Sequence, residues 1–191
     1  MKKQNNDTQK SRIIMGIDPG TNKMGYGVIS VCGGEARYIT MGYISIPSTL
    51  PTYKKLEVIF SRIDEIMSTY CPSEVAYEAP FFGKNIQSML KLGRAQGVAM
   101  AAAIKHGATI FEYAPRKIKI AITGKGGASK EQVANLLKAI LKLEELPKNL
   151  DSTDGLAVAL CHHYQENNQS FTGTKKSWED YVKSNPEKVK K

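Results

Sequence analysis

The chain has 191 residues, of which 41% are hydrophobic and 24% charged, a composition that can build one sizeable core. No stretch approaches the roughly 18 consecutive apolar residues of a membrane span, and the N-terminal residues lack the apolar segment of a signal peptide, which predicts a cytoplasmic protein. The net charge of +9 favours a polyanionic partner without identifying it. Much of this charge is peripheral, since residues 1–12 hold four bases and one acid, and residues 175–191 hold six lysines and three acids.

The first part of the chain predicts three strands and a helix. β-rich runs at 13–17 and 26–31 flank the turn DPGTNKMG, which is typical of a hairpin, and a third strand is expected at 36–46. From Leu56 onward the apolar residues recur with the period of an amphipathic helix.

The second part of the chain predicts strands alternating with helices. The expected elements are a strand at 74–79, a helix at 85–105, a strand at 109–113, a short helix from Pro115 to Gly124, a helix opened by a capping box of Ser129 and Gln132 and ending near Leu143, and a last helix from Asp151. This order indicates an α/β fold with parallel crossovers. We expect one folded domain at 13–165, a disordered polar leader at 1–12 and a flexible basic tail at 166–191.

The long helix at 85–105 has a face of small residues, with alanine at 95, 99, 102 and 103. Small side chains allow close helix packing, and this face is compatible both with core packing and with pairing of two copies. The pattern leaves the two interpretations open.

Four acids stand where a purely structural protein gains little from them. Asp18 directly follows the apolar run IIMGI, and Glu78 ends a second apolar strand. Asp151 and Asp154 lie three residues apart in the first turn of the last helix, so they share one face. Asp18 alone could be a turn residue and Asp151 a helix cap, whereas a carboxylate in an apolar strand, such as Glu78, needs a partner. The four together favour a functional site.

If these acids converge, they need cations. Two unit charges about 4 Å apart repel by roughly 4 kcal/mol at an effective dielectric near 20. The cysteines and histidines lack metal-ligand spacing, and sites built from oxygen ligands select hard ions, which predicts two Mg²⁺ per subunit, with Mn²⁺ a plausible substitute. Such a pair suits in-line attack on a phosphodiester, so the pattern favours a nuclease.

Four ordered blocks strengthen this interpretation: GIDPGTNKMGYGVI, YEAPFFGKNIQSMLKLGRAQGVA, YAPRKIK and DSTDGLAVALCHHY. In order and separation they strongly resemble the RuvC family of Holliday junction resolvases over about residues 13–165. The resemblance implies a ribonuclease H-like fold with a five-stranded mixed sheet flanked by helices. It also implies a magnesium-dependent endodeoxyribonuclease, acting as a homodimer that makes paired cuts in a four-way DNA junction during recombination and repair, together with a branch-migration motor of RuvA and RuvB.

The resemblance also implies roles for individual residues. The metal ligands would be the four acids already named, and Lys119 and Lys130 would approach the scissile phosphate. Substrate contacts would fall on Phe81, Phe82, Lys84, Arg94 and Arg116. Ala79 and Pro80 depart from the family's pattern, and the proline stiffens the approach to Phe81.

Three alternatives remain at this point. GIDPGT also resembles the phosphate loop of the actin and sugar-kinase ATPases, although these need a second such domain. The same fold could serve a ribonuclease H or a general flap nuclease, and a binding module without catalysis would need none of the acids.

Overall fold

The computed structural model of the chain describes residues 11–80 and 85–171, with side chains described as far as Glu166. Residues 1–10 of the expected leader, Phe81, Phe82, Lys84 and most of the expected tail lie outside the described residues. Arg12, which was expected in the leader, begins the first strand.

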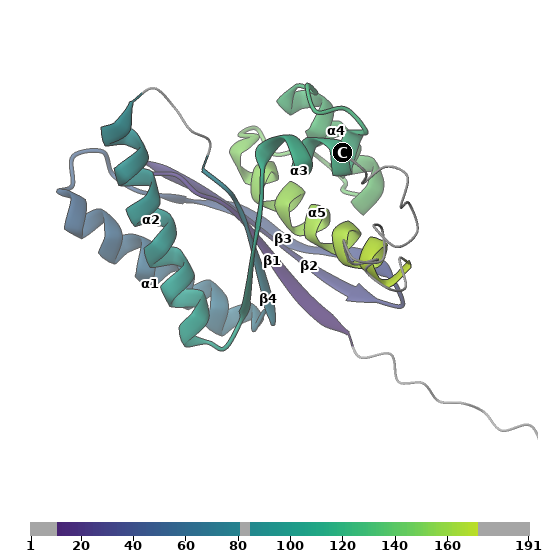
Figure 1. Ribbon diagram of the computed structural model, residues 1–191, viewed down its shortest axis with the longest axis horizontal. Helices are drawn as coiled ribbons and strands as arrows, with labels where there is room; N and C mark the ends of the chain where they lie inside the picture. Colours follow the sequence, from purple (N-terminus) through teal and green to yellow (C-terminus); the bar gives the residue numbers. More distant parts are fainter. Residues whose placement is uncertain (1–10, 81–84, 172–191) are drawn as a thin grey trace, which may run out of the picture.

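One mixed sheet forms the centre of the fold (Figure 1). Its strands are β1 (Arg12–Asp18), β2 (Lys23–Cys32), β3 (Glu35–Ser45), β4 (Glu74–Glu78) and β5 (Thr109–Tyr113). They lie in the order β3-β2-β1-β4-β5, with β3, β2 and β1 antiparallel and β1, β4 and β5 parallel. This arrangement confirms the expected ribonuclease H-like sheet.

Helices cover both faces of this sheet (Figure 1). α1 (Thr52–Tyr70) and α2 (Ile86–Lys105) pack on one face, while α3 (Pro115–Thr123), α4 (Lys130–Leu141) and α5 (Asp151–Phe171) lie on the other. The expected start of α3 at its proline, its end at Gly124 and the capping box of α4 are all confirmed. α5 runs to Phe171, past the expected domain boundary at Gln165. No helix in the described part of the chain is both long and apolar enough to cross a bilayer.

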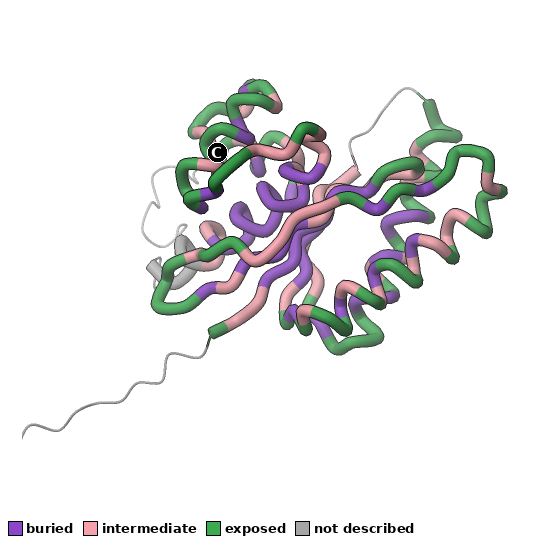
Figure 2. The backbone as a smooth tube through the Cα atoms, turned by 180° about the vertical axis from the view of Figure 1, so that it is seen from behind, coloured by how far each residue is buried: buried purple, intermediate pink, exposed green. Residues whose placement is uncertain are grey.

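Successive side chains of β1 and β4 point to opposite faces of the sheet, and each face has its own hydrophobic core. Ile14 and Ala76 belong to the core on the α5 side, whereas Met15, Ile17, Val75 and Tyr77 belong to the core beneath α1 and α2. Figure 2 shows the buried residues concentrated along the central strands and α5. Both faces of β1 and β4 are therefore fixed by core packing.

The small-residue face of α2 is part of the second core. Ala95, Ala99, Ala102 and Ala103 are all at most 1% exposed and pack in the cluster that holds α1 and the sheet. Of the two interpretations of this face, the structure confirms core packing. Any pairing of two copies through α2 must therefore use the opposite side of the helix.

Glycines let α5 lie directly against the sheet. A Cβ added at Gly155 would come within 2.5 Å of the Tyr26 Cα, and one added at Gly25 would come within 2.4 Å of the Asp151 carbonyl oxygen. Both contacts are with backbone, so neither is relieved by a side-chain rotation. The N-terminal part of α5 is therefore held close to β2, and its first turn lies at the end of the sheet where β1 ends.

Gly155→Ala is expected to lower the free energy of unfolding by about 1–3 kcal/mol, because the added methyl group meets the backbone of β2 and forces α5 outward. Gly127→Ala is the matched control, since a Cβ there meets nothing within 4 Å. Denaturant unfolding of both variants measures the difference. Equal stability of the two variants would show that α5 does not depend on this close approach.

Candidate metal centre

The register of β1 and β4 places two of the four acids side by side. Ile17 pairs with Tyr77 in the parallel ladder, so Asp18 and Glu78 occupy the next position on each strand. Because side chains alternate along a strand and Ile17 and Tyr77 face α1 and α2, the two acids face α5. Asp18 and Glu78 therefore converge, as the metal-site prediction required.

α5 brings the other two acids to this place from its first turn. The backbone N–H of Asp151 donates to Asn149 Oδ1 at 3.0 Å, an interaction that fixes the start of the helix. One turn of helix spans Asp151 to Asp154, which puts both carboxylates on the side toward the ends of β1 and β4.

Most of the predicted catalytic residues line one small cleft. It has a volume of about 190 Å³, and its polar lining consists of Asp18, Glu78, Asp154, Lys119 and Lys130. Asp151 is linked to this cleft through Lys130. The structure therefore brings together all six residues expected to take part in catalysis.

Lys130 is the cation in closest contact with the acids. Its Nζ lies 2.6 Å from Asp151 Oδ1 and 2.7 Å from Asp154 Oδ2. Lys23, from the start of β2, approaches Asp151 Oδ2 at 3.4 Å. Within residues 11–80 and 85–171, Asp18 and Glu78 form no ion pair, so the cleft holds two acids in contact with a lysine and two without one.

Burial raises the pKa of three of the four acids, including Asp154, which contacts Lys130. Burial, together with repulsion from Asp154, raises the pKa of Asp18 to about 6. Burial and repulsion from Asp18 raise the pKa of Glu78 to about 7. Burial also raises the pKa of Asp154, whereas the hydrogen bond from Lys130 lowers the pKa of Asp151. The cleft is thus short of positive charge around Asp18 and Glu78.

This donor set suits hard divalent cations. Carboxylate oxygens are the ligands that Mg²⁺ and Mn²⁺ prefer, and two half-buried acids without a cation are a site where a bound ion would relieve both burial and mutual repulsion. Asp151 and Asp154 already contact the Lys130 ammonium. A bound ion can take the place of that ammonium, because Lys130 is partly exposed and has a flexible side chain.

The predicted substrate contacts are less concentrated. Arg116 is exposed on α3, and its side chain lies against Gly126 in the loop that leads to α4. Arg94 is exposed on α2, which covers the opposite face of the sheet from α5. Neither arginine lines the cleft of the four acids.

A second group of possible metal ligands lies at the other end of β4. Glu74, His162 and Glu166 place one ligand atom each within 4.8 Å of one another. Arg12 forms ion pairs with both glutamates, and the Tyr113 hydroxyl lies 2.7 Å from His162 Nδ1. Arg12 already supplies positive charge here, so this network serves to attach α5 to β1, β4 and β5.

Sequence reasoning missed Lys23 and Asn149 at the site, and it missed the glycines that seat α5. The alternating glycines of β2, in MGYGV, are the signal that could have been used, since glycine within a strand marks close approach of another backbone. Nothing in the sequence distinguishes Lys23 from other exposed lysines.

Comparison with known proteins agrees with this geometry. Residues 14–162 match the model of the family described as crossover junction endodeoxyribonuclease RuvC. The RuvC protein of Christiangramia forsetii is 52% identical over 186 residues, 95% of each chain, and that of Bacteroides fragilis is 53% identical over 183 residues, 95% of this chain and 97% of its own. The chain belongs to the RuvC family. A solved structure, Thermus thermophilus RuvC in complex with Holliday junction substrate, superposes with a TM-score of 0.77 at 31% identity, covering 83% of this chain and 96% of that RuvC chain.

Asp18→Asn is expected to stabilise the metal-free RuvC-family chain, and by more at pH 8 than at pH 5. Folding raises the pKa of Asp18 from 3.8 to about 6 and that of Glu78 from 4.5 to about 7, so the folded state takes up protons in this window. Stability therefore falls as the pH rises through it, and removing the Asp18 charge relieves that loss. Thermal unfolding at the two pH values measures the effect.

The exposed residue Glu35 offers a control, because Glu35→Gln changes the same charge without entering the cleft. Adding Mg²⁺ should raise the Tm of the wild type and of this control, and hardly change that of Asp18→Asn. A pH-independent loss of stability in Asp18→Asn would contradict the charge-repulsion account.

Proposed function

We propose that this chain is a structure-selective endodeoxyribonuclease that resolves Holliday junctions by paired symmetric cuts, in homologous recombination and DNA repair. The observation that carries the proposal is the convergence of four acids from β1, β4 and α5 in a chain of the RuvC family. The T. thermophilus relative in complex with a Holliday junction supports the choice of substrate.

Asp18, Glu78, Asp151 and Asp154 would hold two Mg²⁺ ions, with Mn²⁺ as a substitute. Such a pair of ions supplies an activated water and stabilises the leaving 3′ oxygen of a phosphodiester. The partial burial of Asp18 and Glu78 limits the water around the reacting phosphate, which strengthens the electrostatic interactions in the cleft.

Lys119 and Lys130 would act on the phosphate. Both line the acid cleft, and their ammonium groups can offset the negative charge that develops on the phosphate oxygens. Burial lowers the pKa of Lys130, but its hydrogen bonds to Asp151 and Asp154 raise it more, so this lysine stays protonated in the site. With ions on the aspartates, its charge would be free to turn toward DNA.

The remaining DNA contacts are also proposed from the family pattern. Arg116 is exposed on the face of the acid cleft, next to the loop before α4, whereas Arg94 projects from α2. Phe81, Phe82 and Lys84 belong to the segment between Glu78 and α2, and aromatic side chains there would stack on bases at the crossover.

A homodimer would pair through the exposed side of α2. Ile86, Leu90 and Ile104 are 73%, 51% and 59% exposed, and they lie along one stripe with Gly93 and Gly97. An apolar stripe of helical spacing that is open to water is typical of a helix that packs against another helix. We also propose a branch-migration motor of RuvA and RuvB as a partner, from family membership.

Asp18→Asn should abolish junction cleavage with Mg²⁺ while junction binding survives, because binding depends mainly on phosphate contacts by lysine and arginine. The assay is cleavage of a synthetic four-way junction with and without Mg²⁺, alongside an RNA–DNA hybrid, a flap and ATP. Equal cutting of all three nucleic acids would favour a general nuclease, and ATP hydrolysis without DNA cleavage would favour the kinase-like alternative. Unchanged activity of the variant would favour a binding module.

Leu90→Glu should convert the dimer to a monomer, because it puts a charge within the apolar stripe of α2. Ile140→Glu, on α4, is the control, since Ile140 is an exposed apolar residue away from that stripe. Sedimentation velocity gives the mass of each variant. A Leu90→Glu protein that remains dimeric would place the interface elsewhere.

A further inference from the structure

A second cleft, larger than the one that holds the acids, lies between α1, α2 and the turn after β1. Its volume is about 380 Å³, and its polar lining includes Thr21, Asn22, Thr52, Lys55, Ser88 and Lys91. Leu56, Ile59 and Ala95 form an apolar floor. None of the residues predicted as catalytic or DNA-binding lies among those that line it.

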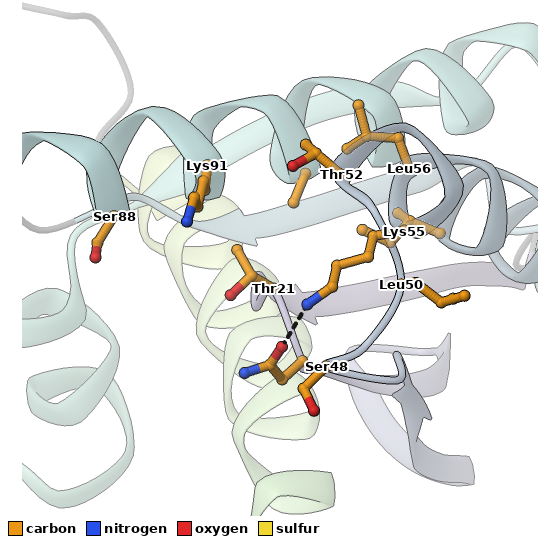
Figure 3. Close-up of a pocket in the computed structure, with 11 residues that line it drawn as sticks. Thr21, Ser48, Leu50, Thr52, Lys55, Leu56, Ser88 and Lys91 are labelled. Atoms are coloured by element: carbon orange, nitrogen blue, oxygen red, sulfur yellow. Dashed lines mark hydrogen bonds between the residues drawn. The ribbon is translucent and has the colours of Figure 1, made fainter.

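Positive charge in this cleft is not neutralised. No acid is found among the described residues that line it, and neither Lys55 nor Lys91 forms an ion pair within the described part of the chain. Lys55 donates to Asn22 Oδ1 at 2.9 Å, which holds its ammonium over the turn. In Figure 3 the two lysines approach the same space from different helices, with Thr21 between them.

The helices that line the cleft add to this charge. Ser88 and Thr52 lie in the first turns of α2 and α1, and neither first turn contains an acid. The N-terminus of a helix carries partial positive charge. The first turn of α1 therefore adds to the positive charge of Lys55 and does not offset it. Hydroxyl and amide groups around two such lysines match the oxygens of a phosphate.

The chain connects this cleft to the acid cleft on both sides. Thr21 and Asn22 follow Asp18 in the turn between β1 and β2, and the next residue, Lys23, contacts Asp151. On the other side, the segment after Glu78 leads to the start of α2, where Ser88 lies. Both clefts therefore open at the edge of the sheet where β1 and β4 end, one on each face.

We propose that this second cleft binds a backbone phosphodiester of the same DNA that is cut in the acid cleft, with Lys55 and Lys91 as the contacts. The assignment rests on the proposed nuclease function, and it adds a phosphate site that positions the strand across the sheet edge. The polar lining offers no pattern specific to a base, so the contact is independent of DNA sequence.

The test is junction binding and cleavage by a Lys55→Gln/Lys91→Gln double variant. Its Kd for a four-way junction should rise about tenfold, and the slope of log affinity against log salt should become less steep by about 1 to 2. At limiting junction with Mg²⁺, cleavage should slow by about the same factor, because fewer junctions are bound. Lys54→Gln is the matched control, since Lys54 is the adjacent lysine of α1, pairs with Glu57 at 2.7 Å and does not line the cleft.

Single methylphosphonate substitutions in the junction locate the contact. Neutralising the phosphate that occupies the cleft should weaken binding by the wild type and leave binding by the double variant unchanged. A double variant that binds with the affinity and salt slope of Lys54→Gln would overturn the assignment. Wild-type cleavage of the junction is scored separately, so a failure of the nuclease proposal is distinguished from a failure of this one.

Discussion

Mutual repulsion among four carboxylates is the constraint around which this molecule is organised. Asp18 and Glu78 lie side by side on neighbouring strands. Burial raises the pKa of both, repulsion from Asp154 adds to the rise at Asp18, and repulsion from Asp18 adds to the rise at Glu78. Such an arrangement costs stability unless cations are present. Under the proposed function, the same unfavourable charge would bind metal and, through the metal, phosphate.

The scaffold is stiff where the site requires it. β1 and β4 are buried on both faces, and α5 lies against the sheet without intervening side chains at Gly25 and Gly155. At the other end of α5, Arg12 and His162 join it to β4 through Glu74. Because α5 is held at both ends, its first turn cannot retreat from Asp18, and the acids stay close despite their repulsion.

Charge is distributed differently on the two faces of the sheet. The face with α5 combines acids with Lys119 and Lys130, whereas the cleft beneath α1 and α2 has lysines and hydroxyls with no acid among its described lining residues. A nucleic-acid strand that crosses the shared edge would meet a site suited to chemistry and then a site suited only to holding phosphate.

The sequence by itself determined the element order, the ends of β1 and β4 at Asp18 and Glu78, and the spacing of Asp151 and Asp154, because periodicity, capping and helix geometry are local properties. Only the tertiary structure decided that Lys130 contacts both aspartates, that Lys23 reaches Asp151, that the alanine face of α2 is core, and that Lys55 and Lys91 share a cleft. Those contacts join residues far apart in the chain, and their geometry depends on how closely α5 and α2 approach the sheet. Local patterns do not contain that distance.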